Sequence, residues 1–521
     1  MENIANSVLL QKPDTSEHNL SEELKTTTSL GRITPVYIAE VVPGDRVDLN
    51  AEFLTKFQPM ATPAFQNFTA YVHYFYVPFR ILWKNWKYFI QNQPAPDGIV
   101  PPHPPILDLS AIDPDDFLPP NINYIFNYFG INGPDNMEAV NALPFSAYQL
   151  IYNEYYRHEQ IHPDLTQDIL LTDGSNNANL TTLSTIRYRT YKDDYFTSAL
   201  KAPQSGNEAS LALATDKMLH VRRNHVPVSG ETKFEFNGQE LPSGTSSDAV
   251  VNNLLNTDPT LAGNELYVDP NDASYAVTMN DLIELNRMQE FLVRQNLAGN
   301  RYNEYILAFF GVRVPDLRLD RPDYITGVKA PVTISEVINT AGSQGYQTGQ
   351  GNSFAEGGRG NYEVLEHGII MGLYTCIPSQ SYLTSIQRLF YKLSYEDYYV
   401  PIFDQMGERE IINKELEQNH VDPYGTFGYV PKFAEYRLPF NKITGEFGTT
   451  LTTWHLANIY DLTQVLDESF FDIRNPDRVF QVGATNADSI LIWLVNKVII
   501  SRPMKKYAMP VLSNNYGNNI F

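Results

Sequence analysis

The clearest alternation of apolar and polar positions lies between residues 46 and 57. One parity is apolar (Val47, Leu49, Ala51, Phe53, Phe57) and the other is polar (Asp48, Asn50, Glu52, Lys56). This period of two is typical of a strand with one face in water. Pro43-Gly44 precedes it and predicts a type II turn, because proline presets φ and glycine accepts a positive φ. Residues 36–42 are therefore expected to bend into this strand.

Residues 68–77 show a different pattern, because both parities are apolar or aromatic. Such a run predicts a strand that is buried on both faces. Pro78 ends it, and apolar residues then recur at three- and four-residue spacing through Ile90. This spacing predicts a helix that packs directly on the strands. The segment thus predicts a strand with one solvent-exposed face, a buried strand and a helix that covers them. This order indicates the edge of a two-layer β structure, not a βαβ nucleotide-binding fold.

Later segments show the same helical and strand spacings of apolar residues. Helices are predicted at 144–162 and, in two parts separated by Gly299, at 278–311, where Thr278 and Asp281 resemble a capping box. Strand-like runs occur at 362–377, 386–400 and 485–501. Because strands come both early and late, we expect the two ends of the chain to pair in one β sandwich.

Three stretches lack a clear period. Residues 1–30 are polar and predict a flexible N-terminal arm that orders, if at all, against a neighbour. Residues 207–277 predict a solvent-exposed insertion within a single domain at 31–521, because so long a polar stretch is no ordinary connector. Residues 342–360 are rich in glycine but lack the Gly-Lys-Ser/Thr ending of a phosphate-binding loop, so they predict a flexible surface loop.

Net charge, cysteine content and the length of apolar runs exclude several classes of function. The formal net charge of -22 excludes a protein whose whole surface coats nucleic acid, because phosphate binding depends on Lys and Arg. The single Cys376 lies in an apolar run and predicts a buried structural thiol in a reducing compartment. The apolar run at 490–500 is too short to span a membrane, and the first residues do not resemble a signal peptide. We therefore expect a soluble protein made in a cytoplasm.

Two patterns suggest metal sites. His158, Glu159 and His162 form an H-E-x-x-H run, in which two imidazoles bind zinc and the carboxylate is the general base of a hydrolase. Pro163 follows directly and disfavours helical geometry at the second ligand, so a polar helix end is the favoured interpretation. Asp113, Asp115 and Asp116 suggest a calcium loop, but they lack its glycine and distal glutamate, which favours a solvated acidic loop.

Two basic stretches carry aromatic neighbours. Arg187, Arg189 and Lys192 alternate with tyrosines, as in sites that bind single-stranded nucleic acid through cations and ring faces. The alternative is a strand whose cations pair with Asp193 and Asp194. Near the C-terminus, Arg502, Lys505 and Lys506 beside Tyr507 form a second candidate.

Several long stretches resemble the major capsid protein of the microviruses, small tailless phages with circular single-stranded DNA, and most of all its gokushovirus-type branch. They include HYFYVPFRILWKNW at 73, LPFSAYQLIYNEYYR at 143, DDYFTSALKAPQSG at 193, AGNRYNEYILAFFGVRVPDLRLDRPDYITG at 298, YEDYYVPIFDQMGEREIINKEL at 395, FGYVPKFAEYRLPFNKITGEF at 427 and SRPMKKYAMP at 501. The matching stretches span nearly the full length of the chain.

The resemblance implies an eight-stranded jelly roll with long insertions, which assembles with its own copies into a T=1 icosahedral virion around single-stranded DNA. It also implies a small basic internal DNA-binding protein, a minor DNA pilot protein and a host surface receptor as partners, with residues 207–277 as a variable protrusion. No enzymatic activity, cofactor or membrane insertion is expected. Two other hypotheses remain beside it: a zinc hydrolase using His158, Glu159 and His162, and a carbohydrate-binding jelly roll outside any virus.

Overall fold

The computed structural model describes most of the chain, and every structural statement below concerns the described residues. These are 14–96, 98, 100–110, 112–113, 124–132, 139–206, 221–223, 266–268, 279–299, 301–338, 347–404, 406–474, 478–481 and 488–506. The chain divides into two compact units, one made of residues 1–203 and 298–521 and the other of residues 204–297.

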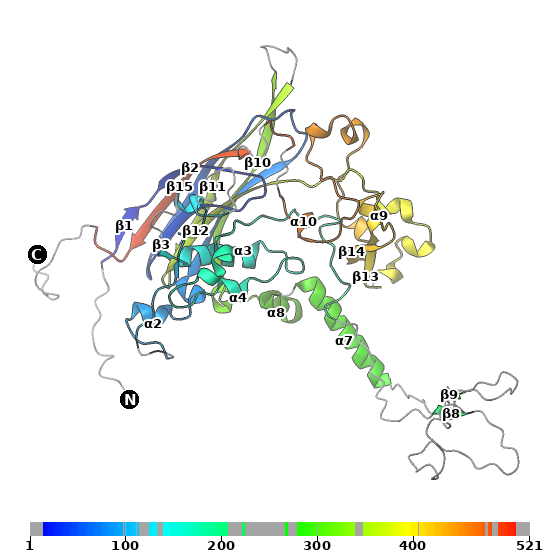
Figure 1. Cartoon of the computed structure of the whole chain (residues 1–521), viewed down its shortest axis with the longest axis horizontal. Helices are drawn as coiled ribbons and strands as arrows, with labels where there is room; N and C mark the ends of the chain where they lie inside the picture. The colour runs from blue at the N-terminus through cyan, green and yellow to red at the C-terminus, as the bar shows by residue number, and fades with distance from the viewer. Residues whose placement is uncertain are drawn as a thin grey trace, which may run out of the picture. The chain divides into compact units, whose positions relative to one another are not determined.

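The first unit is built on one antiparallel sheet of nine strands. Along the sheet the order is β1-β15-β4-β11-β10-β5-β12-β3, and β2 also pairs with β15. The strands are β1 (Ser16–Asn19), β2 (Glu22–Thr28), β3 (Thr34–Val41), β4 (Arg46–Phe57), β5 (Phe68–Pro78), β10 (Asp323–Ile338), β11 (Gln347–Glu363), β12 (Gly368–Pro378) and β15 (Ile490–Arg502). Figure 1 shows the first strands, in blue, beside the last one, in red.

Pairing of the two chain ends is confirmed. β15 runs antiparallel to β4 over twelve residue pairs, from Ile490 opposite Phe57 to Ser501 opposite Arg46. On its other edge β15 pairs with β1 and β2. Residues 16–19 and 22–28 of the expected flexible arm are therefore sheet strands of their own chain. Their polar side chains concealed this, because an edge strand is held mainly by backbone hydrogen bonds.

The sheet curls around an apolar core. β10 pairs with β5 through residues 323–332 and with β11 through residues 333–338, so it belongs to both halves of the curled sheet. The apolar parity of β4 predicted from sequence is fully buried. Across the interior, the hydroxyl of Tyr74 donates to Asn496 Oδ1 at 2.5 Å, and Asn496 Nδ2 donates to the carbonyl of Val36 at 3.1 Å. The fold is mainly β and of the jelly-roll type, although the count of eight strands is not confirmed.

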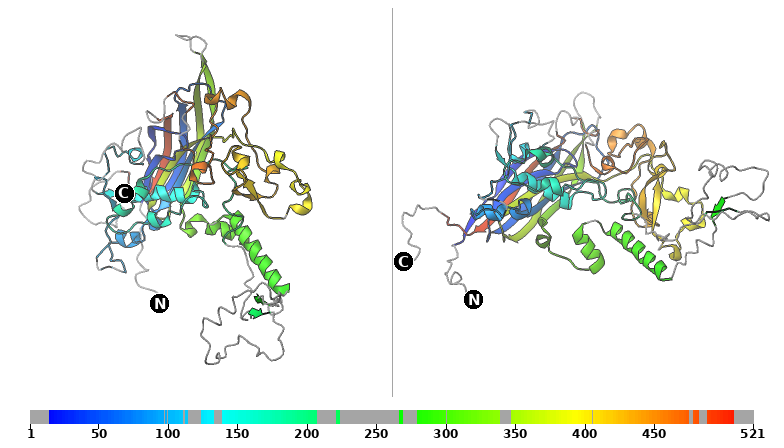
Figure 2. Two further views of the ribbon diagram at one scale, coloured as in Figure 1. Left: turned by 45° about the vertical axis from the view of Figure 1, so that its right-hand side comes forward. Right: turned by 60° about the horizontal axis from the view of Figure 1, so that its bottom comes forward.

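A layer of short helices covers the outer face of β5 and β12 (Figure 2). The expected helix after Pro78 is broken at Trp83, because the carbonyl of Leu82 accepts the amide of Leu171 at 3.0 Å and the Trp83 indole donates to Asp173 at 2.8 Å. The predicted helix at 144–162 ends earlier, at Tyr155. The elements are α1 (Phe79–Leu82), α2 (Trp86–Ile90), β6 (Ile106–Leu107), η3 (Asn127–Phe129), β7 (Val140–Asn141), α3 (Leu143–Tyr155), α4 (Thr166–Ile169), η4 (Asn177–Asn179) and α5 (Leu180–Ser184).

A second group of short elements follows β12 in the same unit. The strand predicted at 386–400 is wrong, because Asp397 Oδ2 accepts the amides of Leu393 and Ser394 and folds the chain into a capped turn. The elements are η6 (Arg388–Tyr391), η7 (Tyr395–Asp397), η8 (Pro401–Phe403), β13 (Glu408–Ile412), α9 (Asn413–Leu416), β14 (Thr426–Pro431), η9 (Ala434–Tyr436), η10 (Gly445–Gly448), η11 (Thr452–Trp454) and α10 (Glu468–Phe471).

The glycine-rich segment was predicted wrongly as a surface loop. From Gln347 onward it forms β11, which lies between β4 and β10 in the sheet. Its glycines allow close packing: a Cβ atom on Gly351 would lie 2.7 Å from the ring of Phe57, and one on Gly360 would lie 2.8 Å from Thr326. Gly358 has a φ of 77° at an irregularity in the pairing with β4. Glycine here indicates crowding rather than flexibility.

The two helices predicted at 278–311 are confirmed as α7 (Met279–Ala298) and α8 (Tyr302–Phe310), and Gly299 and Gly311 adopt a positive φ after them. Thr278 lies outside the described residues. In the second unit the structure also describes a two-stranded sheet of β8 (Val221–Arg223) and β9 (Leu266–Val268). The other residues of 207–277 lie outside the description. One further turn, η5 (Asp316–Leu319), precedes β10, and no described helix is long and apolar enough to cross a membrane.

Candidate functional site

The H-E-x-x-H run does not form a metal centre. Residues 158–162 lie in a turn beyond α3, not on a helix, and their side chains have separate partners. His162 Nε2 lies 2.9 Å from Asp472, the His158 ring packs 4.4 Å from that of Phe471, and Glu159 pairs with Arg301 at 2.6 Å. Burial and His162 lower the pKa of His158 to about 4. The run stabilises the junction of several loops.

No group of three potential metal ligands occurs within the described parts of the chain. Of the three aspartates considered for calcium, only Asp113 is described, and Asp115 and Asp116 lie outside. The lone Cys376 is buried on β12 as predicted, and burial raises the pKa of its thiol. A protonated, inaccessible thiol is a poor nucleophile.

The basic segment at 187–192 is held in place by backbone hydrogen bonds on both sides. The amide of Ile33 donates to the carbonyl of Arg187 at 2.9 Å, and the amide of Ile473 donates to the carbonyl of Arg189 at 3.0 Å. Residues from the start, the middle and the end of the chain therefore meet at this segment. Its side chains are positioned by the tertiary fold rather than by a helix or a long strand.

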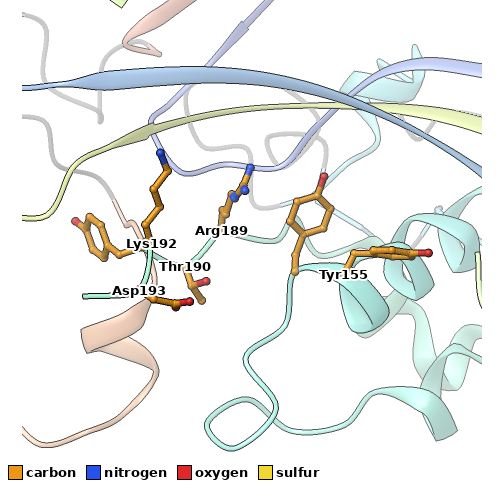
Figure 3. A pocket seen from close by; sticks show the side chains of 7 residues that line it. Tyr155, Arg189, Thr190, Lys192 and Asp193 are labelled. Carbon is orange, nitrogen blue, oxygen red and sulfur yellow. The ribbon is translucent and has the colours of Figure 1, made fainter. Parts of the chain in front are cut away.

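Arg189 and Lys192 face a shared aromatic surface. The Arg189 guanidinium lies 4.5 Å from the centre of the Tyr71 ring and 5.5 Å from that of Tyr156, and Lys192 Nζ lies 5.7 Å from that of Tyr71. Figure 3 shows both cations extending in one direction while Thr190 and Asp193 point to the other side. They line a pocket of about 410 Å³. Its lining residues are Tyr155, Tyr156, Arg189, Thr190, Tyr191, Lys192 and Asp193.

Within the described chain, the carboxylate partners expected from sequence do not neutralise these cations. Asp194 instead accepts the Tyr382 hydroxyl at 2.7 Å and backbone amides of its own turn. Arg189 donates to the neutral Thr375 hydroxyl at 3.0 Å, and Lys192 is exposed. Most other described arginines pair with a carboxylate, although the chain has 60 acidic residues against 38 basic ones. Two unneutralised cations in so acidic a protein form a local anion-attracting site.

A half-buried histidine contacts Tyr156, one of the residues that line the pocket. His73 Nδ1 lies 2.7 Å from the Tyr156 hydroxyl, and the imidazole stacks on the Tyr156 ring. Burial first, and the nearby charge of Arg189 second, lower the pKa of His73 to about 4. His73 is therefore neutral at physiological pH, so the positive charge at the pocket comes from Arg189 and Lys192.

The other basic candidates differ from this pair. Arg187 donates to Gln149 Oε1 at 2.7 Å and to the carbonyl of Thr182 at 3.2 Å, which ties the segment to α3 and α5. Arg502 pairs with the buried Asp45 at 2.8 Å. Lys505 and Lys506 are exposed beyond β15. The structure thus separates Arg187 and Arg502, which hold the fold together, from cations that are available to a ligand.

Sequence reasoning missed Tyr71, whose ring lies beside both Arg189 and Lys192. Tyr71 is more than a hundred residues away from Arg189 along the chain, and no spacing rule connects them. The available signal was the parity of β5, on which Tyr71, His73 and Phe75 alternate with core residues. Chemically, ring faces beside unneutralised cations suit a ligand with bases and phosphates, because bases stack on rings and phosphates attract cations.

Comparison with known proteins agrees with the fold. Residues 8–512 match the family described as capsid protein (F protein). The chain is 27% identical to capsid protein VP1 of Chlamydia phage 1, with 95% of each chain covered. It is 26% identical to capsid protein VP1 of Bdellovibrio phage phiMH2K, over 95% of each chain, and to that of Spiroplasma virus 4, over 93% of each chain. The zinc hydrolase has no support from these relatives or from the geometry. The chain belongs to the phage capsid protein (F protein) family.

Proposed function

We propose that this chain is the major capsid subunit of a small single-stranded DNA phage and that its copies assemble into a closed T=1 icosahedral shell. The observation that carries the proposal is the match to a capsid family over residues 8–512. A curled jelly-roll sheet that joins the first and last strands suits this role, because such double-layer β folds recur in viral shells. The proposed location is the virion, after assembly in the host cytoplasm.

Assembly is tested directly on the purified full-length chain. Electron microscopy of particles from expressing cells should show uniform closed shells, and sedimentation velocity should show a large species that grows with protein concentration. A chain that sediments as a monomer at every concentration and salt, and yields no particles, contradicts the proposal.

We further propose that Arg189 and Lys192, with Tyr71 and Tyr156, contact the packaged single-stranded DNA. The support is the pairing of cations with ring faces and their lack of carboxylate partners in the described chain. Arg187 and Arg502 are proposed to act by holding the fold, and Lys505 and Lys506 are proposed as further exposed DNA contacts. The net charge of -22 leaves most of the DNA charge to other cations, which supports a small basic internal protein as a partner.

The DNA contact is tested with Arg189→Ala combined with Lys192→Ala. Shells should form normally, and the slope of log affinity for single-stranded DNA against log salt should fall by about 1.4, because each lost phosphate contact removes about 0.7. Particles should also release DNA at lower salt. The control combines Lys56→Ala with Lys84→Ala, which removes the same charge from exposed positions outside this site. Equal slopes for the two double variants contradict the assignment.

The remaining partners follow from the resemblance and stay proposals. They are a minor DNA pilot protein, a host surface receptor and a protruding role for residues 207–277. Residues 204–297 form a compact unit of their own. This supports an insertion whose sequence can vary independently of the sheet. Deleting 207–277 should leave shell formation intact in electron micrographs while reducing attachment to the host.

A further inference from the structure

Exposed apolar and aromatic side chains gather on the turns that follow β12, and together they are called the apolar patch. Most of its side chains belong to one segment of about twenty residues, and Leu393 and Ile402 are 93% and 79% exposed. Aromatic residues, leucine, isoleucine and methionine dominate it, which is the composition of the centre of a protein interface. The patch consists of Leu389, Phe390, Leu393, Tyr395, Tyr398, Tyr399, Val400, Ile402, Met406 and Tyr436.

Direct contacts connect the tyrosines of this patch to one another and to Lys392 and Phe403. These ring pairs and cation–ring contacts span distances from 4.3 to 6.5 Å. The contacts are Tyr395 with Phe403, Tyr399 with Tyr436, Lys392 over Tyr398 and Tyr436, and Lys432 over Phe403. The proline at the start of η8 and the capped turn of η7 fix the backbone beneath it.

The charge beneath the patch is already neutralised. Lys392, which is buried, lies 2.7 Å from Glu435, and Glu435 also pairs with Arg409 at 2.9 Å. Arg388, at the start of η6, pairs with the buried Glu415 at 2.6 Å. A partner can therefore cover the rings without leaving these charges unpaired, which would otherwise oppose binding.

The size of the patch indicates what covers it. At roughly 200 Å² for each whole side chain, the ten exposed residues present on the order of 1,000 Å². The largest apolar patch of a typical monomer is roughly 300–600 Å², whereas each side of a standard interface buries about 800 Å². The patch therefore has the area of one side of a complete protein interface.

We propose that the apolar patch at 389–406 and Tyr436 is a contact between subunits and that its occupant is a second copy of this chain. The proposal rests on the proposed capsid function and adds to it the surface that drives association. In a closed symmetric assembly every subunit makes the same contacts with its neighbours. The apolar patch of each subunit would therefore face the same surface on a neighbouring subunit.

The test combines Leu393→Asp with Ile402→Asp in the full-length chain. Both side chains are so exposed that the monomer should keep its circular dichroism spectrum and melting temperature. Burying two aspartates in the contact should lower the association constant at least about 100-fold in sedimentation velocity. The control is Leu365→Asp, which places the same charge at a leucine that is 67% exposed outside the patch.

If the wild type assembles and the patch variant assembles equally well, the proposal that the patch is a subunit contact is wrong. A wild type that never assembles overturns the capsid function itself, so the two failures are distinguishable. A second measurement does not depend on the folding of the variant: a benzophenone amino acid at position 393 in assembled particles should crosslink two copies of this chain. A crosslink to another virion protein, or no crosslink, overturns the proposal.

Discussion

Asp488 connects the start and the end of the chain through a buried ion pair. Its carboxylate lies 2.9 Å from Arg32 Nη1, and the side chains are only 4% and 6% exposed. It also accepts the hydroxyls of Thr27 at 2.7 Å and Ser29 at 3.1 Å. Asp488→Ala leaves the Arg32 charge buried without its carboxylate, so the free energy of unfolding should fall by about 3–5 kcal/mol.

Urea unfolding of the monomeric full-length chain, followed by tryptophan fluorescence, measures this change. At an m-value of about 3 kcal/mol per molar urea, the midpoint should fall by roughly 1–1.7 M. The control is Glu363→Ala, which breaks an exposed pair with Arg46 on the same sheet and should cost about 0–1 kcal/mol. Arg32→Met combined with Asp488→Leu should restore most of the stability, because no charge is stranded. Equal midpoints for Asp488→Ala and Glu363→Ala would refute the reasoning.

Two further predictions concern the sheet and a buried acid. Gly351→Ala should lower the free energy of unfolding by about 1–3 kcal/mol in urea melts, because the new Cβ atom would lie 2.7 Å from the Phe57 ring. The control is Gly98→Ala, whose Cβ atom would have no neighbour nearer than 3.6 Å. Equal unfolding midpoints for the two variants contradict the packing argument. Both Glu408 carboxylate oxygens are buried without a hydrogen bond among the described residues, and burial raises the pKa of Glu408 from 4.5 to about 7. The folded state therefore retains a proton that the unfolded state releases, so stability falls between about pH 4.5 and 7. Glu408→Gln should remove about 1 kcal/mol of that fall after allowance for solvent screening, and an unchanged pH slope in urea melts contradicts it.

Sequence alone determined those elements whose pattern is local. The alternation in β4, the turn at Pro43-Gly44, the helices α7 and α8, and the late strand β15 follow from period, punctuation and length, and the structure has all of them. The family resemblance rested on long irregular stretches and agrees with the family match over residues 8–512. The pairing of β4 with β15 was also accessible, because an amphipathic early strand and an apolar late strand each needed a partner.

Where local pattern and packing disagree, only the tertiary structure determined which element forms. β11 is a central strand because glycine lets its backbone approach Phe57 and Thr326, a cause invisible in a glycine-rich sequence. Residues 16–19 and 22–28 are strands because the edge of β15 offers them backbone hydrogen bonds, and their polar side chains give no sign of this pairing. Likewise Arg189 and Tyr71 meet only after folding, since neither their spacing nor their charge encodes contact between a loop and a strand so far apart in the chain.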